Sequence, residues 1–230
     1  AAAKVERPVK WIGDRLESFV SDNQGRDQIV EAEMAFDEAG KITALRVKCA
    51  YNVGAYLTEV AFISPMFATL LASGVYAIPA IRAENAAVFT NTVSTAPYRG
   101  AGRPEASYIL ERMIDIGAAE MGKDPVELRR INLVKSDQMP YQTPLMHAYD
   151  CGEFDVVMEN TLKASDWDGF DARRKTSEAG GLLRGRGVAC YLEAATIFND
   201  RMEIRFDPSG SVTVLAGTFS HGQGHETVYA

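Results

Sequence analysis

The sequence predicts an α+β fold, with mixed sheets and helices formed by separate segments of the chain. Apolar and polar residues alternate with a period of two in residues 28–53, which is typical of strands that bury one face. Apolar residues recur at helical spacing in residues 104–134. With 230 residues, 47% of them hydrophobic, the chain has enough apolar material for one large or two small domains.

The first elements are expected to be a short helix and a long hairpin. Residues 14–20 mix charged and apolar side chains and end at a polar turn, residues 22–25, which predicts a short helix. Residues 28–36 and 42–53 alternate on both sides of a loop that contains Gly40, which predicts a hairpin. Such hairpins are usually scaffold, so we assign this one no function.

A buried helix and a strand are expected next. Residues 62–73 are mostly apolar and are followed by Gly74, which predicts a buried helix that stops there. Residues 81–90 are rich in β-forming residues and predict a strand that leads into a glycine-rich turn. A turn between a strand and a helix is a suitable place for binding a ligand.

Two helices are expected to follow that turn. Pro104 suits the first turn of a helix, and Gly122 suits the position just after its end. Asp124 and Pro125 then predict the N-cap and the first position of a second helix. The apolar side of the first helix is formed by Ile109, Leu110, Met113, Ile114 and Ile116.

After residue 134 the apolar periodicity stops. Residues 138–150 contain prolines and polar residues without a regular pattern, so they are expected to connect a first domain, residues 1–137, to a second, residues 151–230. In the second domain the pattern predicts helices over 153–164 and 167–178 and a hairpin over 202–215.

The segment Arg184-Gly185-Arg186-Gly187 allows two interpretations. Its arginines and glycines would suit a phosphate-binding loop, but no helix follows closely, and the next residues, 188–192, form an apolar run. A loop that leads into a strand is therefore the favoured interpretation. Glu193, at the end of this strand, is expected to pair with an arginine rather than to act in catalysis.

The glycine-rich turn carries the clearest functional pattern. Arg99 offers five donors and a permanent charge, and Gly100 and Gly102 remove side chains that would block the approach of a bulky anionic ligand. A purely structural alternative is that Arg99 and Arg103 pair with carboxylates and that the glycines only shape the start of the helix.

A second glycine-containing loop lies near the end of the sequence. Gly222 and Gly224 allow a close approach of the backbone to a ligand, and Gln223 can both donate and accept hydrogen bonds. A helix is expected to begin around Glu226. A zinc site at His221 and His225, or a turn with solvated histidines, are alternatives; the glycines between the histidines argue against the helix that zinc ligands at this spacing need.

Charge and cysteine content exclude several classes of function. A formal net charge of -7 argues against nucleic-acid binding as the main function. No apolar run has the length of a membrane span, and no secretory signal is visible. The three cysteines are widely spaced and form no Cys-x-x-Cys pair, which indicates neither a disulfide framework nor an iron–sulfur site. A reducing cytoplasm is the expected compartment.

Two segments carry a family resemblance. Residues 97–106 and 124–133 look like the molybdenum-binding large subunit of the xanthine dehydrogenase, aldehyde oxidase and carbon monoxide dehydrogenase family. Residues 217–230 are similar to that family's later pterin-contacting loop. The resemblance implies parts of two molybdopterin-binding domains, and an internal fragment of a longer subunit, because an upstream cofactor loop and the catalytic glutamate have no counterpart here.

The resemblance also implies a cofactor and a set of residues that hold it. The cofactor is molybdopterin with its molybdenum, for which a cytosine dinucleotide form is an alternative. No residue of the chain is expected to bind the metal directly or to act as the catalytic base. The residues expected to contact the cofactor are Arg99, Gly100, Ala101, Gly102, Arg103, Gly222, Gln223, Gly224, His225, Glu226 and Thr227.

The reaction implied is the oxidative hydroxylation of an aldehyde, an N-heterocycle or a related small molecule with oxygen derived from water. Electrons are expected to leave through 2Fe-2S and FAD on partner domains or subunits of a hetero-oligomeric parent. Gly100 stands where true carbon monoxide dehydrogenases have a copper-binding cysteine, and Ala101 where xanthine- and aldehyde-oxidising members have a stacking phenylalanine. The alternative function is a non-catalytic module that binds a small anion or assembles subunits.

Overall fold

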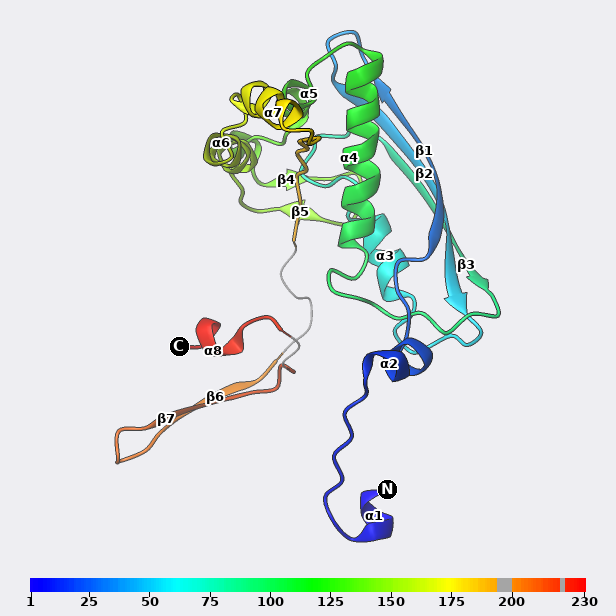
Figure 1. Ribbon diagram of the computed structural model, residues 1–230, viewed down its shortest axis with the longest axis vertical. Helices are drawn as coiled ribbons and strands as arrows, with labels where there is room; N and C mark the ends of the chain where they lie inside the picture. The colour runs from blue at the N-terminus through cyan, green and yellow to red at the C-terminus, as the bar shows by residue number, and fades with distance from the viewer. Residues whose placement is uncertain (194–199, 220–221) are drawn as a thin grey trace. The chain divides into compact units, whose positions relative to one another are not determined.

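Figure 1 shows the computed structural model of the chain. The structure describes residues 1–193, 200–219 and 222–230. The chain divides into two compact units, Ala1–Glu193 and Ala194–Ala230, and each is described by itself. The first unit contains a three-stranded sheet with helices, and the second contains a hairpin and a short helix. The predicted α+β class is confirmed.

The N-terminal part of the first unit contains two short helices. Helix α1 (Ala2–Val5) is followed by α2 (Arg15–Ser21), which confirms the predicted short helix. The side chain of Asp14 accepts from the N–H of Glu17, and the Glu17 carboxylate accepts from the N–H of Asp14, both at 2.9 Å. This capping box explains why the helix begins at this point.

The sheet of the first unit has the order β1-β2-β3. Strands β1 (Gln28–Phe36) and β2 (Ile42–Gly54) are antiparallel and form the predicted hairpin. Strand β3 (Ile81–Phe89), also predicted, runs parallel to β2 and begins with Ile81 opposite Leu45. A parallel partner requires a crossover connection, which here contains helix α3 (Ile63–Leu70).

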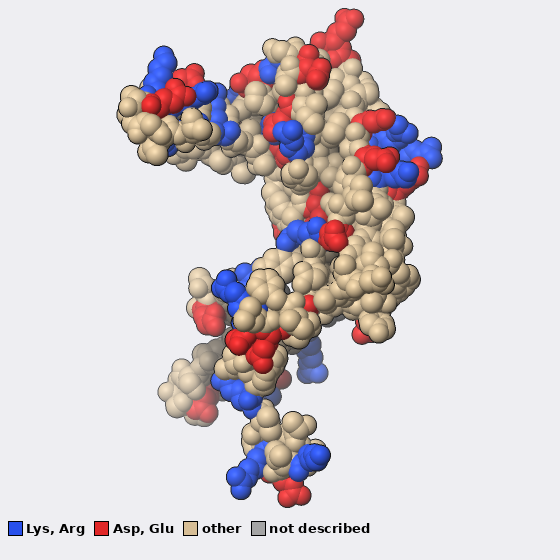
Figure 2. Space-filling view, turned by 45° about the vertical axis from the view of Figure 1, so that its right-hand side comes forward, with Lys and Arg blue, Asp and Glu red and all other residues tan. Residues whose placement is uncertain are grey.

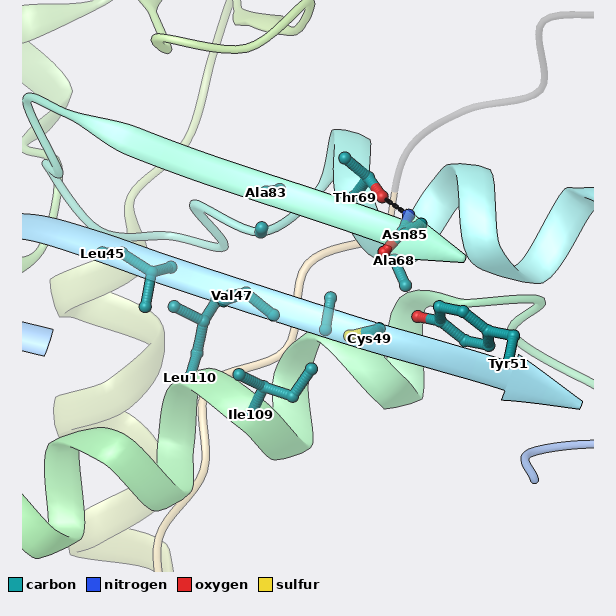
Figure 3. A pocket seen from close by; sticks show the side chains of 12 residues that line it. Leu45, Val47, Cys49, Tyr51, Ala68, Thr69, Ala83, Asn85, Ile109 and Leu110 are labelled. Atoms are coloured by element: carbon teal, nitrogen blue, oxygen red, sulfur yellow. Dashed lines mark hydrogen bonds between the residues drawn. The ribbon is translucent and has the colours of Figure 1, made fainter. Parts of the chain in front are cut away.

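Helices α3 and α4 (Arg103–Glu120) pack on one side of this sheet. Strand β2 directs Leu45, Val47, Cys49 and Tyr51 into the core, where Ile109 and Leu110 of α4 meet them (Figure 3). The small cavity among these side chains measures about 10 Å³, so it is a packing gap and not a ligand pocket. The alternation seen in the sequence therefore places the apolar face of the hairpin against the helices.

The predicted helical pair is confirmed at α4 and α5 (Pro125–Asn132). Gly122 has a φ of 63° just after the end of α4, as expected for a residue in the left-handed region. Asp124 Oδ1 accepts from the N–H groups of Val126 and Glu127, at 2.8 and 3.1 Å. The two predicted caps thus explain where α4 ends and where α5 begins.

The remaining part of the first unit holds short strands and two helices. A 3-10 turn, Ser136–Gln138, precedes the paired strands β4 (Tyr141–Gln142) and β5 (Ala148–Tyr149). Helices α6 (Phe154–Ala164) and α7 (Phe170–Ala179) confirm the two predicted helices, although α7 begins after Gly169 and not at Trp167. The division into domains at 138–150 stays a prediction.

The strand predicted for residues 188–192 is wrong. Val188, Cys190 and Leu192 are half-buried against the core and alternate with exposed residues, as in a strand. However, no strand of the described residues pairs with this segment, and a strand is defined by its ladder of hydrogen bonds. The apolar periodicity identified the buried face correctly but carries no information on a partner.

The second unit contains the predicted hairpin. Strands β6 (Met202–Phe206) and β7 (Val212–Ala216) are antiparallel, with Met202 opposite Ala216. The turn between them is closed by Asp207, whose side chain accepts from the N–H of Ser209 at 2.8 Å. Helix α8 (His225–Val228) begins beside the predicted residue Glu226.

Charged side chains of both signs are interspersed over the face of the molecule shown in Figure 2. On the sheet, exposed ion pairs join Arg46 to Glu33 and Arg82 to Glu84. Of the helices in the described part of the chain, none is both long and apolar enough to cross a bilayer.

Candidate functional site

The glycine-rich turn has an unusual backbone. Gly100, Ala101 and Gly102 follow one another with φ values of 91°, 43° and 97°. The N–H of Ala101 donates to the Tyr98 carbonyl at 2.7 Å, and the N–H of Arg103 donates to the Gly100 carbonyl at 3.0 Å. Positive φ is strained for an alanine, so the turn is held by its surroundings.

The close packing of the turn explains its two glycines. A Cβ at Gly102 would lie 2.2 Å from the Ser64 carbonyl oxygen and 2.7 Å from the Ala68 nitrogen, both in α3. A Cβ at Gly100 would lie 2.6 Å from the Pro104 ring. Gly102 therefore lets the start of α4 approach α3, and Gly100 lets the turn close against Pro104, so both glycines shape the start of the helix as the structural alternative expects.

The two arginines of the turn have different surroundings. The Arg103 side chain is only 12% exposed; its Nε lies 2.5 Å from Glu193 Oε1, and its guanidinium lies 4.5 Å from the centre of the Phe67 ring. Glu193 thus pairs with an arginine, as expected. Arg99 is exposed. Of the two guanidinium groups, that of Arg99 lies where a ligand outside the turn can meet it.

Residues that the sequence analysis missed surround the turn. Arg26 donates from Nη2 to the Arg99 carbonyl, and its guanidinium carbon lies 4.9 Å from the centre of the Tyr98 ring. Arg26 Nε also lies 3.9 Å from Glu105 Oε2. No local pattern could have identified Arg26, because 73 positions separate it from Arg99.

A small polar cavity lies beside these residues. It measures about 20 Å³, and Arg26, Tyr51, Thr95 and Glu105 contribute to its lining. Among the described residues, neither the buried Tyr51 hydroxyl nor Glu105 Oε2 has a hydrogen-bond partner. Burial raises the pKa of Tyr51, so its phenol stays protonated and can donate at neutral pH. The cavity is large enough for a water molecule but not for a substrate.

The second predicted loop is part of the second unit. Gly222 and Gly224 have φ values of 102° and 77°, and Gly224 is the N-cap of α8. Gln223 donates from Nε2 to the Phe219 carbonyl at 2.8 Å, while His225 stacks on Tyr229 with 4.9 Å between ring centres. A Cβ at Gly224 would meet no atom of the described residues within 4 Å. Unlike Gly102, this glycine leaves the backbone open on its Cβ side.

The loop exposes Gln223, Glu226 and Thr227. The zinc alternative depends on His221, which lies outside the described residues together with Ser220. Residues 1–193, 200–219 and 222–230 contain no group of three or more His, Cys, Asp or Glu side chains suited to a metal ion. Taken separately, the turn of the first unit carries a guanidinium, which suits an anionic group, and the loop of the second unit carries an amide, which suits a ligand with hydrogen-bonding edges.

Comparison with protein families gives two matches. Residues 1–133 match a family described as a molybdopterin cofactor-binding domain. Residues 160–230 match a second family with the same description. The first match contains the turn at residues 99–103, and the second contains the loop at residues 222–227.

Similar proteins cover the whole chain. The carbon monoxide dehydrogenase large chain of Hydrogenophaga pseudoflava is 32% identical, and the match covers 100% of this chain and 31% of that protein. Subunit gamma of the 6-hydroxypseudooxynicotine dehydrogenase complex of Paenarthrobacter nicotinovorans is 31% identical over 100% of this chain and 30% of its own length. The chain thus spans about a third of the length of these relatives.

A solved structure agrees with these matches. Quinoline 2-oxidoreductase from Pseudomonas putida 86 superposes with a TM-score of 0.86 at 30% identity, over 98% of this chain and 31% of that one. The similarity in structure therefore extends over both parts of the chain that match the families.

Proposed function

Since the chain belongs to the family of molybdopterin cofactor-binding domains, we propose that it supplies two cofactor-binding loops to a molybdenum hydroxylase large subunit. The observation that carries this proposal is the order of the two family matches, each of which contains one predicted loop. The proposed parent is a longer protein, since the chain spans 31% of the carbon monoxide dehydrogenase large chain. Its domains would be residues 1–137 and 151–230.

The residues of the two loops fit such a cofactor chemically. Arg99 is exposed and offers a planar set of donors to an anionic group. The open Cβ side of Gly224 allows the backbone to approach a bulky planar ligand, and Gln223 can match its hydrogen-bonding edge. The proposed contacts are Arg99, Gly100, Ala101, Gly102 and Arg103 in one loop and Gly222, Gln223, Gly224, His225, Glu226 and Thr227 in the other.

These residues differ in the role that we assign to them. Arg99 and Gln223 would bind and orient the cofactor, whereas Gly100, Gly102 and Arg103 would hold the backbone of the turn through α3, Pro104 and Glu193. When bound, the cofactor supplies the redox chemistry of a hydroxylation that uses oxygen derived from water. The chain offers no assigned catalytic base, so the proposed base belongs to another part of the parent.

The substrate is proposed to be an aldehyde, an N-heterocycle or a related small molecule. Carbon monoxide oxidation with copper is disfavoured, because Gly100 provides no thiolate, the type of ligand that soft copper ions need. A cysteine there would also bring its Cβ within 2.6 Å of the Pro104 ring. Electron transfer would pass through 2Fe-2S and FAD partners of a hetero-oligomer, and the name of one relative includes a multi-subunit complex.

Molybdenum and pterin content test the proposal. Protein purified from its host should contain both in near-stoichiometric amounts, measured by elemental analysis and by the fluorescence of the oxidised pterin. The double variant Arg99→Ala, Gln223→Ala should contain at least about ten-fold less bound pterin than the wild type, because it removes the proposed charged and neutral hydrogen bonds to the cofactor. Arg46→Ala, on the exposed face of the sheet, is the control and should keep it.

The opposite result would favour the alternative module. A folded protein that contains neither molybdenum nor pterin, in a host that makes the cofactor, would contradict the proposed function. In that case binding of small anions or of partner subunits to the same loops becomes the function to measure.

A further inference from the structure

We propose that Arg26 is a positioning residue for the glycine-rich turn and, through the turn, for Arg99. This inference deepens the proposed function, on which its relevance to the cofactor rests. Arg26 lies between α2 and β1, outside both predicted cofactor loops. Three separate contacts of its guanidinium reach the turn or the start of α4.

The three contacts use different properties of the guanidinium. Its face lies over the Tyr98 ring at 4.9 Å, and one of its N–H groups donates to the Arg99 carbonyl. Its Nε lies 3.9 Å from the carboxylate of Glu105, in the first turn of α4. A planar group with donors at its edge can make all three contacts at once, and a lysine ammonium cannot.

The backbone places Arg26 where these contacts are possible. The N–H of Gln24 donates to the Ser94 carbonyl at 3.2 Å, and the N–H of Ala96 donates to the Gln24 carbonyl at 2.9 Å. A Cβ at Gly25 would lie 3.1 Å from Tyr98 Cβ, so the two segments pack closely. The residues before Arg26 thus run beside the residues before the turn.

Backbone strain occurs on both sides of the contact. Arg26 has a φ of 57° and Ala101 a φ of 43°, and both are non-glycine residues in the left-handed region. Such residues persist only where the surrounding structure holds them. The contacts of Arg26 are a physical cause for the strained conformation of the turn.

The carboxylate of Glu105 adds a charge to this arrangement. Its side chain is 4% exposed, and it lines the cavity of about 20 Å³ together with Arg26 and Tyr51. A buried carboxylate without a nearby cation is unfavourable. Arg26 therefore has two separable effects: it offsets the charge of Glu105, and it fixes the turn through Tyr98 and the Arg99 carbonyl.

Hydrogen exchange of the intact protein separates these two effects. In Arg26→Gln, the amides of Ala101 and Arg103 should exchange at least about ten-fold faster, because local opening of the turn becomes easier. The amides of the β1–β2 hairpin should exchange as in the wild type. Arg46→Gln, which breaks the exposed pair with Glu33, is the matched control and should leave the turn unchanged.

The double variant Arg26→Gln, Glu105→Gln tests what Arg26 does. It removes both charges, so it should restore stability lost by leaving Glu105 unpaired, but the turn amides should still exchange fast. Wild-type exchange of the turn in the double variant would overturn the proposal, since Arg26 would then act only as a counter-ion. Unchanged exchange of the turn in a folded Arg26→Gln protein would also overturn it.

A second variant covers the case in which Arg26→Gln does not fold. Tyr98→Leu removes the ring under the guanidinium and should accelerate the same two amides; no change there would contradict the proposal. Exchange is measured without reference to the cofactor, and pterin content is measured separately. If neither the wild type nor any variant contains pterin, while the exchange of the turn amides still depends on Arg26, the proposed function is rejected and the positioning role remains.

Discussion

Single residues in the turn show how a glycine pattern can have two causes. In the sequence, Gly100 and Gly102 suggested room for a ligand. In the structure, a Cβ added at Gly100 would collide with Pro104, and one added at Gly102 would collide with α3. Gly122 also has a positive φ, but a Cβ there would meet no atom within 4 Å in the part of the chain that the structure describes. A comparison of Gly122 with Gly102 therefore separates the effect of the backbone conformation from the effect of crowding.

Substitution at these glycines gives the first stability prediction. Gly122→Ala should lower the free energy of unfolding by about 1 kcal/mol, the usual penalty of an alanine in the left-handed region. Gly102→Ala adds a collision with α3 backbone and should lower it by more than about 3 kcal/mol. Thermal and urea unfolding measure both; equal losses would show that the crowding at α3 relaxes easily.

Helices α4 and α5 are joined by a buried ionic cluster. Arg129 is fully buried; its Nε donates to Glu111 Oε2 at 2.8 Å, and its Nη2 donates to Asp115 Oδ1 at 2.9 Å. The Tyr76 hydroxyl donates to Glu111 Oε1 at 2.5 Å. Burial raises the pKa of Glu111, and Arg129 and Tyr76 oppose that effect. The cluster is stable only as a complete set of partners.

Removing one partner of this cluster should therefore be costly. Arg129→Met leaves the Glu111 carboxylate buried without its cation and should destabilise the protein by about 3–5 kcal/mol. The double variant Arg129→Met, Glu111→Leu should recover part of this loss. Arg130→Ala breaks the exposed pairs with Glu159 and Glu127 and should change stability by less than about 1 kcal/mol. A loss as small for Arg129→Met as for Arg130→Ala would contradict this account.

Over the whole molecule, buried tyrosines make stability sensitive to alkaline pH. Burial raises the pKa values of Tyr51, Tyr76 and Tyr149. The folded state keeps the phenol protons at a pH at which an unfolded tyrosine, with a pKa near 10, has lost its own. The contribution of these phenols to the free energy of unfolding is therefore complete below about pH 10 and is lost as the pH rises further.

The unfolding temperature should therefore fall steeply above about pH 10. Tyr149→Phe should make this fall shallower, because one buried phenol is removed. Tyr108→Phe is the control, since Tyr108 is exposed, and should leave the slope unchanged. Unfolding followed from pH 8 to 11 by circular dichroism tests this; the same slope in both variants would contradict it.

Local patterns predicted elements well and their partners poorly. Asp124, Gly122 and the alternating hairpin were predictable because caps and periodicity depend on neighbours in the sequence. The parallel pairing of β2 with β3 was not, because periodicity does not specify which strand lies alongside. For the same reason residues 188–192 were predicted as a strand. Arg26 was missed since its contacts join distant parts of the chain.

The distance along the chain between Arg26 and its contacts has a consequence for the order of folding. The β1–β2 hairpin closes locally and is expected to form early, whereas the contact from Arg26 to Arg99 must close a loop of 73 residues. The turn is therefore expected to reach its final conformation later than the hairpin. We therefore expect an interval during synthesis in which the hairpin has formed and the turn is still open, and under the proposed function the cofactor would be inserted in that interval.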